Sequence, residues 1–168
     1  MKIKDYDEFC FAGDSYYDRK YFDQVHFSDE FDFSKPIGGL WLCPYLGNDN
    51  PSEWTDFVEE NKMTKDISHI TVFKLKEDTR ILILDDPYEF EREYGEFIDY
   101  REGRLARSNI KFDEVKKEYD AFFVDGSVVT LLSGVSCAFT PVRLYGWDVE
   151  TLYVLNPDVL IETGRFIL

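Results

Sequence analysis

Short apolar runs, separated by turn-forming residues, dominate the hydrophobic pattern of the chain. Such runs are typical of buried strands, whereas a helix usually shows a longer segment with a period of about 3.6 residues. The ranges that we expect to form strands are 9–12, 40–43, 67–75, 80–84, 121–124, 128–132, 142–145, 151–155 and 159–161. Because few helical segments lie between them, the pattern predicts an α+β fold with mostly antiparallel sheets.

One helix start is marked by polar residues that precede an apolar stripe. Asn50 is suited to cap this helix and Pro51 to occupy its first position. Trp54, Phe57 and Val58 follow at helical spacing on one face. The sequence therefore predicts a helix directly behind Pro51.

Two further helices and one long loop complete the expected elements. A helix is expected after Pro87, with Phe90, Tyr94 and Phe97 on its inner face, and a shorter one over 113–119. Residues 14–34 are rich in aromatic and acidic side chains without a sustained period. A loop of that length is uncommon in a compact domain unless it serves a site.

Composition and charge narrow the class of protein. The chain has 168 residues, 44% of them apolar, without a repeat or linker, so we expect one domain over 1–168. Nineteen basic and 34 acidic residues give a net charge of −15. That charge repels duplex nucleic acid and anionic membranes as direct partners, and it attracts a protein target with a basic surface.

The cysteines indicate the compartment. Cys10, Cys43 and Cys137 are odd in number and widely spaced, which fits neither a metal site nor a disulfide framework. The start of the chain lacks the apolar core of a signal peptide, and no run reaches membrane-spanning length. We therefore expect a cytoplasmic protein without a metal centre.

A glycine pair and a late acid are the strongest local candidates for a site. Gly38 and Gly39 run directly into the apolar segment Leu40–Cys43, and glycine lets a backbone approach a ligand closely. Glu150 stands at a strand entry near Trp147, where aromatic side chains can shield a carboxylate from water. Taken alone, each feature is more typical of an ordinary turn than of a ligand site.

Several short motifs together resemble the ADP-ribosyltransferase-like family, in particular its small divergent phage and bacterial members. The motifs that carry the resemblance are the segments 9–13 (Phe-Cys-Phe-Ala-Gly), 35–41 (Lys-Pro-Ile-Gly-Gly-Leu-Trp), Trp54, 145–151 (Tyr-Gly-Trp-Asp-Val-Glu-Thr) and 156–158 (Asn-Pro-Asp). The resemblance implies two packed, mostly antiparallel sheets with flanking helices, and a cleft for NAD between the sheets. It implies an enzyme that transfers ADP-ribose from NAD to a macromolecular target as nicotinamide leaves.

The resemblance also implies a set of site residues. Glu150 would be the catalytic acid, which orients the ribose and stabilises the positive charge that develops on it. Gly13 is implied to contact the nicotinamide amide of NAD through its backbone. The middle-strand residues implied to contact NAD are Gly39, Leu40, Trp41 and Cys43. Trp41, Tyr45 and Trp54 are candidates to pack against the nicotinamide ring.

The chain departs from the family pattern at two places. Cys10, Phe11 and Ala12 offer no His or Arg in the first motif, and Cys43 replaces the usual serine. An apolar side chain cannot hydrogen-bond the ribose or the carboxamide, so these departures weaken NAD binding. The alternative is a catalytically inactive relative, acting as an acidic inhibitor or binding protein, with phage origin and a basic host protein as its target.

Overall fold

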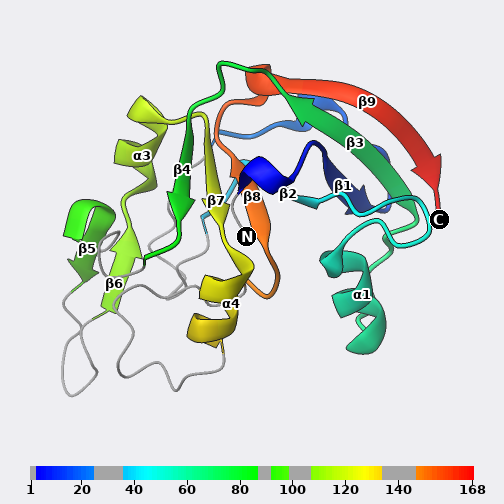
Figure 1. Cartoon of the computed structure of the whole chain (residues 1–168), viewed down its shortest axis with the longest axis horizontal. Coiled ribbons are helices and arrows are strands. Elements are labelled where there is room, and N and C mark those ends of the chain that lie inside the picture. Colours follow the sequence, from blue (N-terminus) through cyan, green and yellow to red (C-terminus); the bar gives the residue numbers. More distant parts are fainter. Residues whose placement is uncertain (1–2, 25–35, 87–91, 99–106, 134–146) are drawn as a thin grey trace.

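The computed structural model of the chain describes residues 3–24, 36–86, 92–98, 107–133 and 147–168 (Figure 1). These residues form a mixed α+β fold. Seven strands form one sheet in the order β4-β7-β8-β2-β1-β3-β9. Their bounds are β1 Phe9–Gly13, β2 Leu40–Pro44, β3 His69–Leu75, β4 Ile81–Leu84, β7 Ala121–Val124, β8 Thr151–Val154 and β9 Leu160–Ile167.

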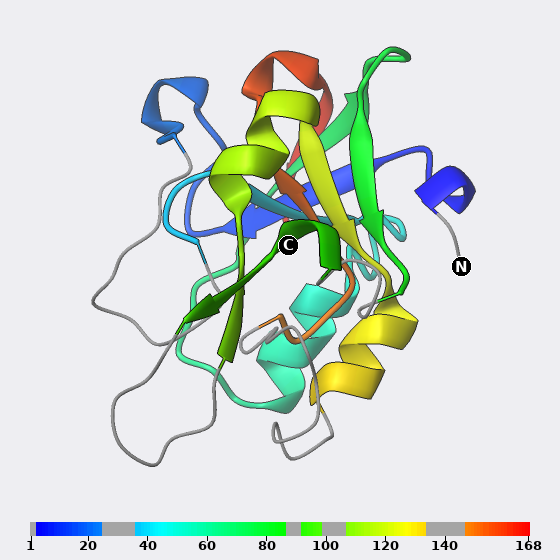
Figure 2. The same cartoon turned by 90° about the vertical axis from the view of Figure 1, so that its left-hand side faces the viewer.

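Helices lie at the ends and sides of this sheet. The described α-helices include α1 Glu53–Glu60, α3 Phe112–Glu118 and α4 Gly126–Ser133, and short 3₁₀ helices span Ile3–Asp5, Arg19–Tyr21 and Pro157–Val159. In both views α1 and α4 lie toward the lower end of the sheet, and α3 packs beside β4 and β7 at its upper end (Figures 1 and 2). Strands β5 (Gly95–Ile98) and β6 (Arg107–Ile110) form a separate antiparallel pair.

The sheet is mostly antiparallel, as the sequence predicts. β4 and β7 run parallel, and the other neighbouring strands in the seven-stranded sheet run antiparallel. The two packed sheets implied by the family resemblance are not confirmed, because the described strands form one seven-stranded sheet and one two-stranded pair. The coarser prediction of an α+β fold is confirmed.

Strand alternation divides the core between two faces of the sheet. On one face, which we call the Phe9 face, Phe9 packs with Leu42, Phe123 and Leu152. Successive side chains of a strand point to opposite faces, so the neighbours Cys10, Cys43 and Tyr153 belong to the other face, which we call the Cys10 face. This division decides which candidate site residues can meet.

Most predicted strands are present within a residue or two. The strands expected at 9–12, 40–43, 67–75, 80–84, 121–124 and 151–155 correspond to β1, β2, β3, β4, β7 and β8, and the run 159–161 opens β9. The helix expected over 113–119 is α3. The strand expected at 142–145 lies outside the described residues, as do residues 25–34 of the expected loop.

Two predicted elements are wrong. Residues 128–132 form part of helix α4 instead of a strand, because Asp125 supplies a helix start by accepting a hydrogen bond from the backbone N–H of Ser127. Phe97 lies in strand β5 instead of on a helix. The expected inner face of that helix therefore does not form beyond Tyr94, and Phe90 lies outside the described residues.

The first helix is correct, but its cap is not the predicted one. Ser52, not Asn50, caps α1, with its hydroxyl accepting from the backbone N–H of Thr55 while the Thr55 side chain accepts from the Ser52 backbone. Pro51 consequently precedes the cap instead of opening the helix. Such reciprocal capping fixes the first turn of α1 against the end of β2.

Candidate functional site

A pocket of about 230 Å³ lies on the Cys10 face, and we call it the Trp41–Trp54 pocket. Four separate parts of the chain line it. They are the β1 residues Cys10, Phe11 and Ala12, the β2 residues Trp41 and Cys43, the α1 region with Ser52, Trp54 and Lys65, and the segment Asp148, Val149 and Thr151. Three of the residues expected to contact NAD, namely Trp41, Cys43 and Trp54, thus meet in one cavity.

Strand pairing explains why these distant residues converge. Cys10 lies directly opposite Cys43 in the β1–β2 register, and Leu42 lies opposite Leu152 in the β2–β8 register. The residues that follow Leu42 and precede Leu152 are Cys43 and Thr151, so both belong to the Cys10 face. The fold therefore brings the first, middle and late motifs of the sequence onto the same side of the sheet.

Aromatic rings form the walls of the pocket. Trp41 is held by Trp147 and Tyr153, with ring centroids 4.4 Å and 4.7 Å away. Trp54 stacks on Phe57 at 5.7 Å with an interplanar angle of 16°. Since both indoles are braced by other rings, the pocket offers fixed aromatic surfaces suited to a planar ligand.

The two cysteines supply an apolar, unreactive floor. Both are free and buried. Burial raises the pKa of the Cys10 thiol to about 12, and burial likewise raises the pKa of the Cys43 thiol. Both thiols are therefore protonated at neutral pH, and neither is suited to act as a nucleophile.

Polar and charged groups stand at the pocket's margins. Thr151 is buried, and its hydroxyl donates to the carbonyl of Val149 at 2.8 Å. The Lys65 ammonium lies 4.8 Å from the centroid of a Trp54 ring, and the Asp148 side chain is exposed. The pocket thus combines an ammonium, a carboxylate and a hydroxyl around apolar walls, a composition common in sites for small organic ligands.

Glu150 lies between two pocket residues in sequence, but its side chain points the other way. One carboxylate oxygen accepts from the hydroxyl of Tyr6 at 2.5 Å, and the other accepts from the backbone N–H of Gly126 at 3.1 Å. Tyr6 packs against Phe9 and Phe123, so this contact is on the Phe9 face. The structure therefore separates Glu150 from the aromatic walls.

The environment of Glu150 alters the pKa of its carboxyl. Desolvation raises the pKa of this carboxyl above its ordinary value, although the hydrogen bonds from Tyr6 and Gly126 oppose the shift. Repulsion from Asp125 and Glu53 adds to the increase. Both carboxylate oxygens have partners, and the group is 5% exposed. In this arrangement Glu150 joins the N-terminal segment to the start of α4.

Gly39 and Leu40 contribute to the packing of the sheet and do not line the pocket. Gly39 adopts a positive φ of 63°, and a Cβ there would lie 2.5 Å from the ring of Tyr153. Leu40 is buried on the Phe9 face, in the cluster that contains Phe9. Only a residue without a side chain fits at Gly39, because of both the backbone angle and the ring.

Gly13 and Tyr45 lie at the periphery of the β1 and β2 region. Gly13 ends β1 opposite His69. Tyr45 follows β2, packs near Phe166 and has a hydrogen bond from its hydroxyl to Asn48. Gly13, Gly39, Leu40, Tyr45 and Glu150 are thus placed outside the pocket lining, and their predicted roles toward NAD stay predictions.

The lining also contains residues that sequence reasoning did not select. Ser52, Lys65, Asp148 and Thr151 line the pocket but were not among the predicted site residues. Thr151 opens β8 and follows Glu150, so strand alternation was the available signal for Thr151. Asp148 lies three residues before β8, where alternation does not apply. Nothing in the local sequence of Lys65 indicates its position, since it depends on where the chain runs after α1.

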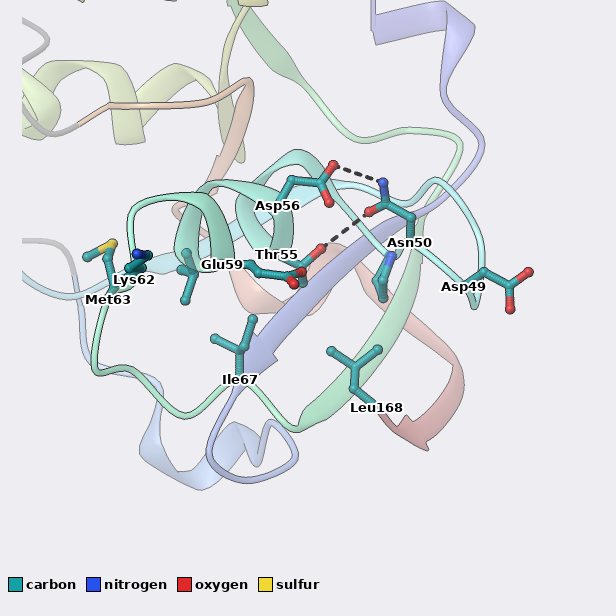
Figure 3. Close-up of a pocket in the computed structure, with 11 residues that line it drawn as sticks. Asp49, Asn50, Thr55, Asp56, Glu59, Lys62, Met63, Ile67 and Leu168 are labelled. Carbon is teal, nitrogen blue, oxygen red and sulfur yellow. Dashed lines mark hydrogen bonds between the residues drawn. The ribbon is translucent and has the colours of Figure 1, made fainter.

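A second cavity of about 750 Å³ lies on the other side of α1, and we call it the α1 groove (Figure 3). It is lined by Asp49, Asn50, Pro51, Thr55, Asp56, Val58, Glu59, Lys62, Met63, Ile67 and Leu168. The groove and the Trp41–Trp54 pocket share no residue, but α1 contributes to both.

Among the described residues, no group of three or more His, Cys, Asp or Glu side chains is placed to hold a metal ion. None of the described helices has the length and apolar character required to cross a bilayer.

Comparisons with protein-family models, with curated proteins and with solved structures find no match to this chain. The site is therefore assessed from its own geometry and chemistry.

Proposed function

We infer that the protein is an ADP-ribosyltransferase-like domain that binds NAD in the Trp41–Trp54 pocket and transfers ADP-ribose to a macromolecular target. One observation supports this function above the others. The first, middle and late motifs, which are far apart in sequence, contribute Cys10, Trp41, Trp54 and Thr151 to one pocket. If these motifs were unrelated surface turns, we would not expect them to line the same cavity.

The pocket suits one end of NAD. Ligand pockets typically have volumes of about 300–1,000 Å³, and this one has about 230 Å³. A pocket of this size holds only part of NAD, and we assign it to the nicotinamide and its ribose, with the remainder of the dinucleotide outside. Trp41 and Trp54 offer faces for the planar ring, while the Lys65 ammonium is a candidate partner for a phosphate.

The remaining question is which carboxylate serves the ribose. Glu150 would have to leave Tyr6 and Gly126 and turn toward the Cys10 face before it could approach a ligand in the pocket. Asp148 already lines the pocket and is exposed. Substitution of Glu150 and substitution of Asp148 should therefore have different effects on ADP-ribose transfer, depending on which carboxylate contacts the ribose.

A direct test measures NAD binding by calorimetry and nicotinamide release by chromatography. The natural chain is compared with Glu150→Gln and Asp148→Asn, which remove each charge with little change of shape. Saturable binding together with nicotinamide release supports the function, and the variant that abolishes release identifies the acid. Absence of both binding at millimolar NAD and nicotinamide release would rule the function out.

The second candidate is a catalytically inactive relative that binds a basic protein. It is favoured by the position of Glu150, whose two oxygens are occupied on the Phe9 face. The net charge of −15 supplies the attraction. This function predicts no nicotinamide release with or without a protein acceptor, and steady release above the blank would contradict it.

A further inference from the structure

The α1 groove combines a charged side and an apolar side. Figure 3 shows Thr55, Asp56 and Glu59 extending from α1 on one side, with Ile67 and Leu168 on the other. Its volume of about 750 Å³ is large enough for several side chains of a partner. A ligand of the groove must therefore have both charged and apolar groups.

The charge of the groove is predominantly negative. Asp49, Asp56 and Glu59 are exposed acids in its lining, and Lys62 is the one basic residue in that lining. Asp56 accepts a hydrogen bond from the Asn50 amide at 2.8 Å. Within the part of the chain that the structure describes, the Asp49 and Glu59 carboxylates have no side-chain partner. Two of the three acids are thus available to a cation.

The apolar side leaves hydrocarbon exposed to water. Leu168 is 51% exposed, and the partly buried Met63 and Ile67 lie in the same lining. Leu168 is held in place by its backbone N–H, which donates to the carbonyl of Ser68 at 2.9 Å. An ordered apolar surface beside unpaired carboxylates matches the side chains of arginine and lysine, since each carries a cation on an aliphatic stem.

The groove lies beside the pocket to which we assign NAD. Trp54 of α1 lines the pocket, whereas Thr55, Val58 and Glu59 of the same helix line the groove. A macromolecule held in the groove would therefore lie one helix away from the proposed NAD site. This placement suits the docking of an acceptor protein.

We propose that the α1 groove is the docking site for an arginine- or lysine-rich segment of a protein partner, with basic side chains at Asp49 and Glu59 and apolar side chains against Met63, Ile67 and Leu168. This proposal deepens the proposed function and rests on it only in identifying the segment as part of the macromolecular target. A nucleic-acid target is disfavoured at this surface, because the carboxylates repel phosphates.

The proposal is tested by fluorescence anisotropy without NAD, so its result is independent of catalysis. The probe is a short fluorescein-labelled peptide of alternating arginine and leucine. Asp49→Asn combined with Glu59→Gln is compared with Glu77→Gln combined with Asp78→Asn, a pair of exposed acids in the turn between β3 and β4. Both double variants remove two negative charges, so the total charge of the protein changes equally.

The groove pair is expected to weaken peptide binding by about fivefold at moderate salt, and the control pair by less than about twofold. Equal weakening by both pairs would overturn the proposal, because it would show attraction to the overall charge alone. Failure of the natural chain to bind the peptide would overturn it as well.

The apolar side has its own control. Leu168→Ser should weaken binding of the arginine–leucine peptide by about threefold, because contact with a half-exposed leucine side chain is lost. It should leave binding of an arginine–glycine peptide unchanged. If Leu168→Ser has no effect on the first peptide, the apolar half of the proposal is wrong. A natural chain that releases nicotinamide from NAD but does not bind the peptide would refute this inference and leave the proposed function in place.

Discussion

Neighbouring residues of the chain have different environments on the two faces of the sheet. On the Phe9 face, Glu150 is buried, and its two oxygens are bound by Tyr6 and Gly126. On the Cys10 face, Thr151 lines a pocket together with Trp41 and Trp54. One peptide bond separates a buried carboxylate that has two hydrogen-bond donors from a hydroxyl residue that lines a pocket.

This difference shows that a motif residue and a site residue need not coincide. The 145–151 motif reaches the pocket through Asp148, Val149 and Thr151, whereas Glu150 fastens the N-terminal segment to α4. A buried carboxylate with two hydrogen-bond donors is costly to release, since its oxygens must be solvated again or paired elsewhere. Substitutions at Gly39, Trp54 and Glu150 test this division between the faces, in order from the largest expected effect to the smallest.

The largest effect is expected from Gly39→Ala. The new methyl group would meet the Tyr153 ring, and the positive φ of Gly39 is unfavourable for alanine. Overpacking and backbone strain together should lower the free energy of unfolding by about 2–4 kcal/mol. Urea denaturation measures this change.

Gly164→Ala is the matched control, because no atom lies within 4 Å of a Cβ added there. Its free energy of unfolding should change by less than about 1 kcal/mol. If Gly39→Ala is as stable as this control but loses NAD binding, Gly39 belongs to the ligand site instead of the structural turn.

A smaller, functional effect is expected from Trp54→Ala. Removal of one aromatic wall of the pocket should weaken NAD binding by about tenfold, because a stacking contact is worth about 0.5–1.5 kcal/mol beyond its buried area. Trp54→Phe retains a ring and should bind within about threefold of the natural chain. Calorimetric titration measures both affinities. Unchanged affinity in Trp54→Ala would place the ligand elsewhere.

The smallest effect concerns the pH dependence of stability on the Phe9 face. Because the folded pKa of Glu150 is raised, its contribution to stability is fully present below the unfolded value near 4.3 and is lost as pH rises through the folded pKa. Glu150→Gln removes this loss. The stability of Glu150→Gln relative to the natural chain should therefore increase as pH rises from about 4 to 7.

Asp120 is a useful comparison in the same measurement, because its pKa is lowered whereas that of Glu150 is raised. Hydrogen bonds from Arg80 hold the pKa of Asp120 at about 2, so its contribution is present above the unfolded value and is lost as pH falls through about 2. Asp120→Asn should therefore flatten the acid limb of the stability profile and leave the region above pH 4 unaffected in shape. A Glu150→Gln profile parallel to that of the natural chain would contradict the raised pKa.

Much of the sheet was predictable from the sequence, because most of its strands are short and largely apolar, whereas the polar part of β9 beyond Ile161 was not predicted. Ala121–Val124 and Thr151–Val154 are buried along their whole lengths and gave clear signals. The run at 128–132 was predicted wrongly, since a short apolar run of β-branched residues does not distinguish a strand from a buried helix. The Asp125 side chain that starts α4 was the overlooked signal.

The site was only partly predictable, for a different physical reason. The aromatic walls Trp41 and Trp54 could be selected from motifs, and the structure brings them together. The direction of Glu150 depends on Tyr6, which is 144 residues away in the chain. Alternation is informative inside a strand, but Glu150 precedes β8 by one residue, so tertiary contacts decide its orientation.

The central claim is that the Trp41–Trp54 pocket binds NAD, and fluorine NMR of 5-fluorotryptophan-labelled protein tests it most directly. The chain contains three tryptophans, which single substitutions to phenylalanine assign. The account predicts that the Trp54 and Trp41 resonances shift during NAD titration with one common dissociation constant. It predicts a smaller shift for Trp147, which is 1% exposed and packs behind Trp41. Resonances for Trp41 and Trp54 that stay fixed up to millimolar NAD would contradict it.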